Sequence, residues 1–112
     1  MKLLDQDTRD GYMRLEITSD SDLWHLKHVL EPGDRLRMDD VRTTIEGDTK
    51  QRCTLTLTAE KTEYTGNRLR ATGEIEQAPE NIQHGYHTFN IEPGVTFDIW
   101  KDEWAQYQID RI

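Results

Sequence analysis

The sequence is short of cysteine, of long apolar runs and of positive charge. The one cysteine, Cys53, excludes an internal disulfide and a zinc site built from several cysteines. No run of about 18 apolar residues is present, which excludes a transmembrane helix. The first residues also lack the apolar stretch of a signal peptide. We therefore expect a cytoplasmic protein.

Positive charge is scarce because 14 Lys and Arg residues stand against 22 Asp and Glu residues, a net charge of −8. Binding to phosphates needs local basic residues, so this balance argues against a protein that simply coats nucleic acid. The acidic residues are spread along the chain, as on proteins that stay soluble in a high-salt cytoplasm. In such a chain a basic cluster is more informative than usual.

The 112 residues are enough for one domain and too few for two. Only 34% of them are hydrophobic and 32% are charged, so we expect a small core of the kind found in compact β-rich domains. No internal repeat or low-complexity segment is present.

The stretch from Ser19 to Gly33 predicts a short helix. Ser19 and Asp22 approximate a capping box at its start, and Pro32 with Gly33 would end it. An apolar stripe at helical spacing should face the core. Its members are Leu23, Leu26, Val29 and Leu30.

Alternation of apolar and polar residues predicts strands before and after this helix. They cover residues 2–4, 12–18, 34–41, 52–60, 68–75, 87–91 and 95–99. Residues 52–60 and 68–75 should form one hairpin, and 87–91 and 95–99 another around Glu92-Pro93-Gly94. The break in alternation at Asp39-Asp40 predicts a bulge.

These elements predict a mainly β fold. One short helix in the N-terminal half and about five short, bent strands after it are typical of a small Sm-like or SH3-like β-barrel. We place this barrel domain at residues 1–101. Residues 102–112 have helix-like spacing and would begin a linker or helix toward following domains that lie outside this chain.

Several short motifs occur in the same order as in one known family. They are Met1-Lys-Leu-Leu4, Asp22-Leu-Trp-His-Leu26, Glu31-Pro-Gly-Asp34, Arg42-Thr-Thr44, Thr54-Leu-Thr-Leu57, Gly85-Tyr-His-Thr88 and Ile91-Glu-Pro-Gly94, with Trp104 after them. On these motifs, which extend over essentially the whole chain, the sequence resembles the N-terminal domain of archaeal Pelota.

The resemblance implies an Sm-like barrel and a role in translation. Members of this family are similar to class-one release factors. They enter the empty A site of stalled ribosomes and promote rescue and no-go mRNA decay, without reading a stop codon. They act with an elongation-factor-like GTPase, which we expect to contact domains absent here. The expected partners are the ribosome, its rRNA and the mRNA, and we expect a monomer that binds no membrane.

In this family a loop between two barrel strands reaches toward the mRNA channel, and the matching segment here is Val41 to Arg52. It holds three basic and two acidic residues within a chain of net charge −8. Lys and Arg would contact phosphate, and Thr or Gln would add hydrogen bonds. The predicted RNA-binding residues are Arg42, Thr43, Thr44, Lys50, Gln51 and Arg52. From spacing alone an ordinary solvated hairpin loop is the simpler interpretation, and the resemblance favours RNA binding.

Arg35 and Arg37 on one predicted strand, and Arg68 and Arg70 on another, form a second basic group. Alternation places each pair on one strand face, so the four could make a single basic patch. The alternative, which we favour, is that they pair with nearby acidic side chains on a solvated surface. The acidic candidates are Asp34, Glu74 and Glu76.

A divalent-metal-dependent endoribonuclease is the alternative function, because this activity has been attributed to the family. Such an enzyme needs clustered carboxylates that hold the ion and orient water. Asp20 and Asp22, or Asp39 and Asp40, could supply them, and the first pair are the metal candidates, although helix capping explains their position. The sequence identifies no catalytic residue, and we expect no cofactor unless the nuclease interpretation holds. A generic Sm-like protein-interaction module is a second alternative. We favour a non-enzymatic, RNA-binding domain.

Overall fold

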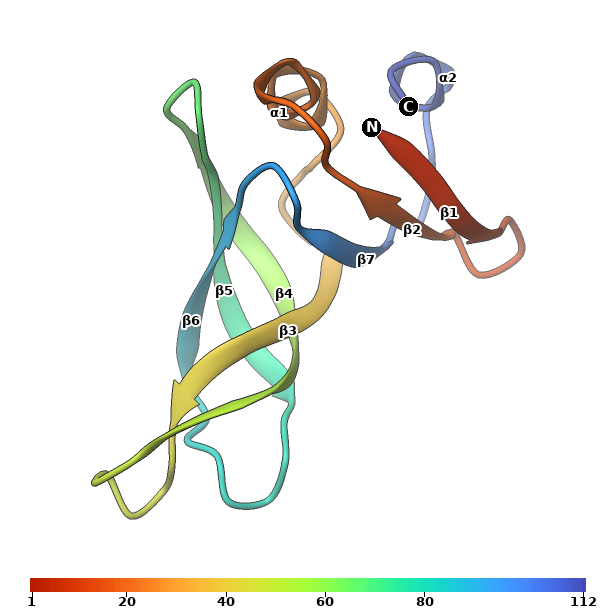
Figure 1. The fold of residues 1–112 in the computed structure, drawn as a ribbon. Coiled ribbons are helices and arrows are strands. Elements are labelled where there is room, and N and C mark those ends of the chain that lie inside the picture. The colour runs from red at the N-terminus through yellow and green to blue at the C-terminus, as the bar shows by residue number, and fades with distance from the viewer.

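The alternating run around Thr54 is part of the longest strand, β4 (Lys50–Tyr64), in which Leu55 and Leu57 are fully buried. The computed structural model describes residues 1–112, and Figure 1 shows one curved sheet with two short helices at one end. The other strands are β1 (Lys2–Asp7), β2 (Tyr12–Glu16), β3 (Arg35–Thr43), β5 (Leu69–Gln77), β6 (Tyr86–Ile91) and β7 (Thr96–Trp100), and the helices are α1 (Asp20–Lys27) and α2 (Gln106–Ile109). The mainly β class is confirmed.

Neighbouring strands are antiparallel throughout, in the order β1-β2-β7-β3-β4-β5-β6. The sheet bends around a single apolar core, and β1 and β6 form its two edges. The predicted β4–β5 hairpin is confirmed, with Tyr64 paired to Leu69 at its turn. Strand β3 lies between β7 and β4, which places its outward side chains beside those of both neighbours.

Strands β6 and β7 do not form the predicted hairpin. β6 pairs with β5, whereas β7 pairs with β2 and β3. Backbone hydrogen bonds explain the separation, because Gly94 N donates to Ile17 O (2.7 Å) and Ile17 N donates to Val95 O (2.9 Å). The chain that follows Glu92 and Pro93 therefore continues beside the end of β2 and brings β7 into the middle of the sheet.

Helix α1 is shorter than its apolar stripe predicted. It ends at Lys27 instead of continuing to Pro32, because its last turn tightens and Val29 N donates to Leu26 O, three residues back. Val29 and Leu30 follow the helix, yet both are buried in the core. The apolar stripe therefore predicted correctly which residues are buried, but it predicted a helix that is too long.

No bulge occurs at Asp39 and Asp40, where the broken alternation predicted one. Both residues keep regular pairing, Asp39 with Thr54 and Asp40 with Cys53. Two irregularities lie instead on the other side of β4, against β5, at residues 56–57 and 59–61. The bend of β4 is therefore associated with its pairing to β5, and its pairing to β3 is continuous.

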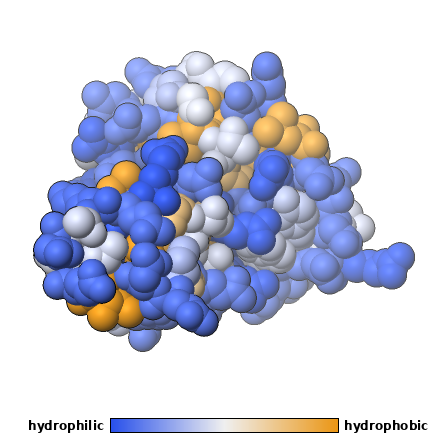
Figure 2. Space-filling model, turned by 60° about the horizontal axis from the view of Figure 1, so that its bottom comes forward, coloured by the Kyte–Doolittle hydropathy of each residue, from blue (hydrophilic) through white to orange (hydrophobic).

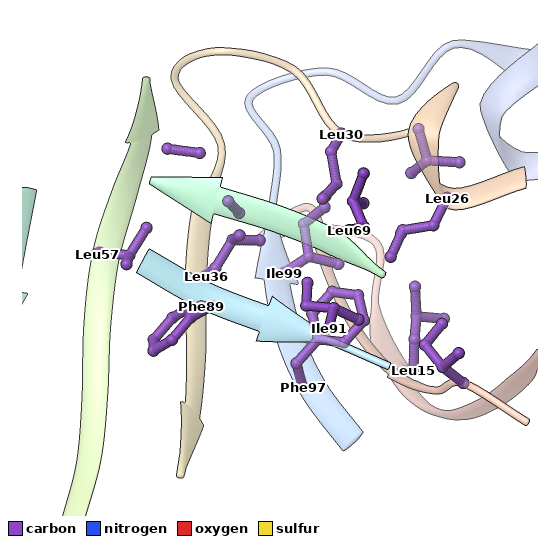
Figure 3. Close-up of a cluster of buried hydrophobic side chains, with 14 of the residues drawn as sticks. Leu15, Leu26, Leu30, Leu36, Leu57, Leu69, Phe89, Ile91, Phe97 and Ile99 are labelled. Atoms are coloured by element: carbon purple, nitrogen blue, oxygen red, sulfur yellow. The ribbon is translucent and has the colours of Figure 1, made fainter. Parts of the chain in front are cut away.

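The core is a cluster of 18 buried apolar residues. Figure 3 shows Leu26 and Leu30 facing leucine, isoleucine and phenylalanine side chains from the strands. The side chains labelled there are Leu15, Leu26, Leu30, Leu36, Leu57, Leu69, Phe89, Ile91, Phe97 and Ile99. Most of the surface seen in Figure 2 is hydrophilic, with small separate hydrophobic patches, as the low apolar content predicts. Neither helix is long and apolar enough to span a membrane.

Residues 101–112 pack against the rest of the chain. Lys101 is 3% exposed, and its ammonium group contacts the carboxylates of Asp34 (2.6 Å) and Glu31 (3.0 Å). The Trp104 ring donates to the backbone of the β1–β2 turn (2.8 Å), and the buried Gln108 donates to Glu31 (2.5 Å). The predicted C-terminal helical segment is present as α2. The domain boundary at residue 101 stays a prediction.

Candidate nucleic-acid interface

The β3–β4 hairpin projects from the end of the molecule opposite the two helices, beside the connection between β5 and β6 (Figure 1). The segment Val41 to Arg52, predicted as strand ends around a loop, is mostly strand. Thr43 still pairs with Lys50, and only residues 44–49 form the turn. The strand ends are longer than expected, because β-branched side chains such as Val41 and Thr43 favour extended backbone and continue the ladder.

The predicted RNA-binding residues are divided between two faces of this hairpin. Residues paired directly across two strands share a face, and successive residues alternate between faces. Lys50 and Arg52 are exposed and, together with the half-buried Thr43, lie on what we term the outer face. Arg42 and Gln51 lie on the opposite, inner face, where both contact the β5–β6 connection.

Arg42 holds the hairpin against the β5–β6 connection. Its Nε donates to Gln83 O (3.2 Å) and its Nη2 donates to His84 O (3.0 Å). The ring of His87 lies between Arg42 and Asp40, with Nε2 2.8 Å from the Asp40 carboxylate. The guanidinium of Arg42 is therefore largely engaged inside the domain and has few donors left for a phosphate.

Thr44 and Gln51 are also used within the structure. Thr44 is buried and pairs with Ile82 in an isolated bridge. The Gln51 side chain accepts a hydrogen bond from Asn81 Nδ2 (2.8 Å). Of the six predicted residues, Thr43, Lys50 and Arg52 lie on the outer face, and the two cations are the most exposed of them; their RNA-binding role stays a prediction.

We expect Arg42→Lys to lower the free energy of unfolding by about 1 kcal/mol, because lysine keeps the charge but lacks the planar fork of donors that matches the positions of the two carbonyls. Arg52→Lys is the matched control, since Arg52 is exposed and donates to no group in the domain, and it should change stability by less than about 0.5 kcal/mol. Urea unfolding monitored by tryptophan fluorescence measures both. Equal stability of the two variants would contradict the assigned role of Arg42.

The turn of the hairpin is acidic. Glu46 and Asp48 are exposed there, and Ile45 is 61% exposed. A tip of this charge would repel phosphate, so an RNA contact is more favourable along the strands behind it. The exposed positive charge of the segment is carried by Lys50 and Arg52, after the turn.

The four arginines predicted as a second basic patch are not neighbours. Arg35 and Arg37 lie on β3 beside β7, whereas Arg70 pairs across the far end of the β4–β5 hairpin and Arg68 lies in its turn. Three of the four pair with acidic side chains, as the alternative predicted, although not with the candidates named. The ion pairs are Arg37 with Asp98, Arg68 with Glu92, and Arg70 with Glu63, while Asp34 pairs with Lys101.

The fold places Arg14, which the sequence did not single out, next to Arg37. Both contact one carboxylate, since Arg14 Nε lies 2.8 Å from Asp98 Oδ1 and Arg37 Nε lies 2.9 Å from Asp98 Oδ2. Tyr12 donates its hydroxyl to the same carboxylate (2.6 Å). Asp98 is 2% exposed. Burial alone would raise its pKa, but these hydrogen bonds hold the pKa of Asp98 below its usual value.

Arg14, Arg37 and Arg52 line one surface hollow of about 570 Å³ on the outer face. Its acidic lining residues are Asp39 and Asp98, so positive charge exceeds negative charge in a chain that is acidic as a whole. Alternation alone predicts that each arginine points outward. It does not predict that β7 lies between β2 and β3. This strand order is what brings the arginines together.

Asp22 has structural partners, as the capping interpretation predicted. Its carboxylate accepts from the backbone of Ser19 (3.2 Å), and from the backbone and the hydroxyl of Thr18 (both 2.8 Å). The amino group of Met1 lies 2.6 Å away. Although burial opposes it, these contacts lower the pKa of Asp22. Asp20 is exposed, and no three His, Cys, Asp or Glu side chains in residues 1–112 are placed to share a metal ion.

Comparison with known proteins identifies relatives over the whole chain. The model of the Pelota N-terminal domain matches residues 1–112. The protein pelota homolog of Staphylothermus marinus is 36% identical over 120 residues, which cover 100% of this chain and 34% of the relative. The chain therefore spans about a third of the length of the curated relatives it matches.

Solved structures agree with this assignment. The crystal structure of Archaeoglobus fulgidus Pelota is 30% identical and superposes with a TM-score of 0.72, covering 99% of this chain and 31% of that protein. A model of ribosome-bound archaeal Pelota and ABCE1 gives 27% identity and a TM-score of 0.75, over 99% of this chain and 34% of that one. The chain belongs to the Pelota N-terminal domain family.

Proposed function

We propose that this chain is the RNA-contacting domain of a Pelota-type factor that engages stalled ribosomes and promotes their rescue and no-go mRNA decay. The observation that carries the proposal is the placement of Lys50 and Arg52 side by side on the outer face, where neither takes part in an ion pair. Unpaired cations keep their donors available for phosphate oxygens. A relative of the same family is described as ribosome-bound, which supports the ribosome as the source of that RNA.

The proposed site of action is the ribosomal A site, where rRNA and mRNA present phosphates to an incoming factor. The domain works by binding, and Lys50 and Arg52 contribute the long-range attraction and the contacts. An elongation-factor-like GTPase would bind domains that this chain does not contain. The proposal places the protein in the cytoplasm, acting as a monomer.

Replacing Lys50 and Arg52 by glutamate is expected to weaken ribosome binding at least about tenfold, because two attractions to phosphate become two repulsions. The measurement uses the fluorescently labelled chain and ribosomes stalled with an empty A site. Both side chains are exposed, so the thermal unfolding midpoint should remain close to that of the wild type.

Lys61→Glu with Arg70→Glu is the matched control. It changes the net charge by the same amount, on exposed side chains of β4 and β5 away from the β3–β4 hairpin. This control should bind ribosomes within about threefold of the wild type. Equal losses in the two double variants would mean that net charge decides binding, and unchanged binding of the Lys50/Arg52 variant would refute the assignment of the outer face.

A further inference from the structure

In the hollow on the outer face, one buried carboxylate orients two guanidinium groups. Asp98 fixes Arg14 through Nε and Nη2 and fixes Arg37 through Nε. The Nη1 of Arg14 and both terminal nitrogens of Arg37 donate to no group within the domain. The two side chains are 46% and 38% exposed. Their free donors therefore face outward from a fixed base.

Aromatic packing adds to this orientation. The guanidinium carbons of Arg35 and Arg37 lie 5.0 and 4.9 Å from the centre of the Trp100 ring, and Tyr12 lies 5.0 Å from the same ring. Contacts of this kind restrict the torsions of an arginine side chain while leaving its edge free. Because less side-chain entropy is lost on binding, oriented arginines are better anion ligands than mobile ones.

Two kinds of polyanion are candidate ligands of the hollow, an RNA strand and an acidic peptide. The residues that line the hollow favour one of them. A peptide interface draws its affinity from apolar and aromatic anchors seated in pockets. Here the apolar lining residues are the half-buried Met38 and Val95 and the buried Phe97, and no exposed aromatic side chain lines the hollow. Phosphate contacts, in contrast, need only charge and hydrogen-bond donors. The hollow also contains Arg52 and so continues the outer face next to Lys50.

We infer that the hollow lined by Arg14, Arg37 and Arg52 is a phosphate-binding site that holds the backbone of single-stranded RNA. Arg14 and Arg37, oriented by Asp98, bind phosphate oxygens, and Arg52 extends the track toward the hairpin. The inference rests on the proposed function, which it deepens by naming a second contact surface, on β2, β7 and β3. Recognition through phosphates is independent of base sequence.

The test uses the wild-type chain and a short fluorescent oligouridine at low salt, with binding followed by anisotropy. Arg14→Gln with Arg37→Gln should weaken binding about tenfold or more and lower the slope of log affinity against log salt by about 1.4, or about 0.7 for each lost contact. Arg68→Gln with Arg70→Gln is the charge-matched control and should stay within about twofold. No binding by the wild type, or equal losses in both variants, would overturn the inference.

A second variant avoids leaving Asp98 without its arginines. Thr96→Glu places a carboxylate in the hollow while both ion pairs remain, and should weaken RNA binding roughly fivefold. Thr62→Glu adds the same charge to an exposed position of β4 outside the hollow and should have little effect. If an oligoglutamate of equal charge competes as well as RNA does, the RNA assignment is wrong.

The two proposals fail in different ways. If the chain binds stalled ribosomes but Thr96→Glu binds oligouridine like the wild type, the hollow is not an RNA site and the proposed function stands. If RNA binding depends on the hollow but the chain does not bind ribosomes, the proposed function is wrong while the phosphate site remains.

Discussion

Gly73→Ala is expected to destabilise the domain by at least about 3 kcal/mol. A Cβ at Gly73 would lie 1.7 Å from Thr58 O and 2.6 Å from the carbonyl carbon of the same residue. Neither atom can rotate away, because both belong to the backbone of β4 at the point where its pairing with β5 becomes irregular. The two strands would have to separate in the middle of the sheet.

Urea unfolding monitored by circular dichroism measures this loss. Gly66→Ala is the informative control, because Gly66 has a positive φ of 96° and an added Cβ would have no neighbour within 4 Å. That variant should lose only about 1 kcal/mol, from backbone strain alone. A similar loss in both variants would mean that the close approach of β4 and β5 at Gly73 relaxes easily.

Local patterns predicted the elements of this fold well. Strict alternation identified the buried faces of β2, β4 and β5, since a residue on a pleated strand repeats its environment every second position. Proline and glycine marked the Glu92-Pro93-Gly94 turn correctly. The position of β7 after this turn was not predicted, because a turn restricts only the local backbone. The hydrogen bonds from Gly94 N to Ile17 O and from Ile17 N to Val95 O join residues far apart in the chain.

The candidate site was also only partly predicted, because it too depends on residues far apart in the chain. The resemblance led to a hairpin that carries exposed cations, and its RNA-binding role stays a prediction. The sequence alone did not show that the residues of this segment lie on two different faces. In the hairpin, Arg42 lies on the inner face and Lys50 on the outer face. Only the outer face points away from the β5–β6 connection. The sequence around Arg14 did not place this residue in the site. Arg14 lies near Arg37 only because β7 pairs with both β2 and β3.

Asp98→Asn is expected to lower the free energy of unfolding by about 2–3 kcal/mol at neutral pH. Asp98 is buried and accepts hydrogen bonds from Tyr12, Arg14 and Arg37. Breaking a fully buried ion pair costs about 3–5 kcal/mol, and the loss should be smaller here because both arginines are partly exposed and regain water. Urea unfolding at a series of pH values measures the difference.

The effect should depend on pH in one direction. The native pKa of Asp98 lies below its unfolded value of about 3.9, so the ionised carboxylate stabilises the fold above that pH. This contribution is lost as the pH falls through the native pKa. The wild type and Asp98→Asn should therefore differ most near neutral pH and converge below about pH 4.

Asp102→Asn removes the same charge from an exposed side chain just after β7 and should leave stability nearly unchanged at every pH. A loss in Asp98→Asn that persists in acid would mean that replacing an acceptor oxygen by an amide donor, and not the loss of charge, destabilises the fold. The same variant separates two explanations of RNA binding. If net charge alone mattered, removing a carboxylate from the hollow would strengthen binding. Because Asp98 orients Arg14 and Arg37, we expect Asp98→Asn to bind oligouridine more weakly than the wild type.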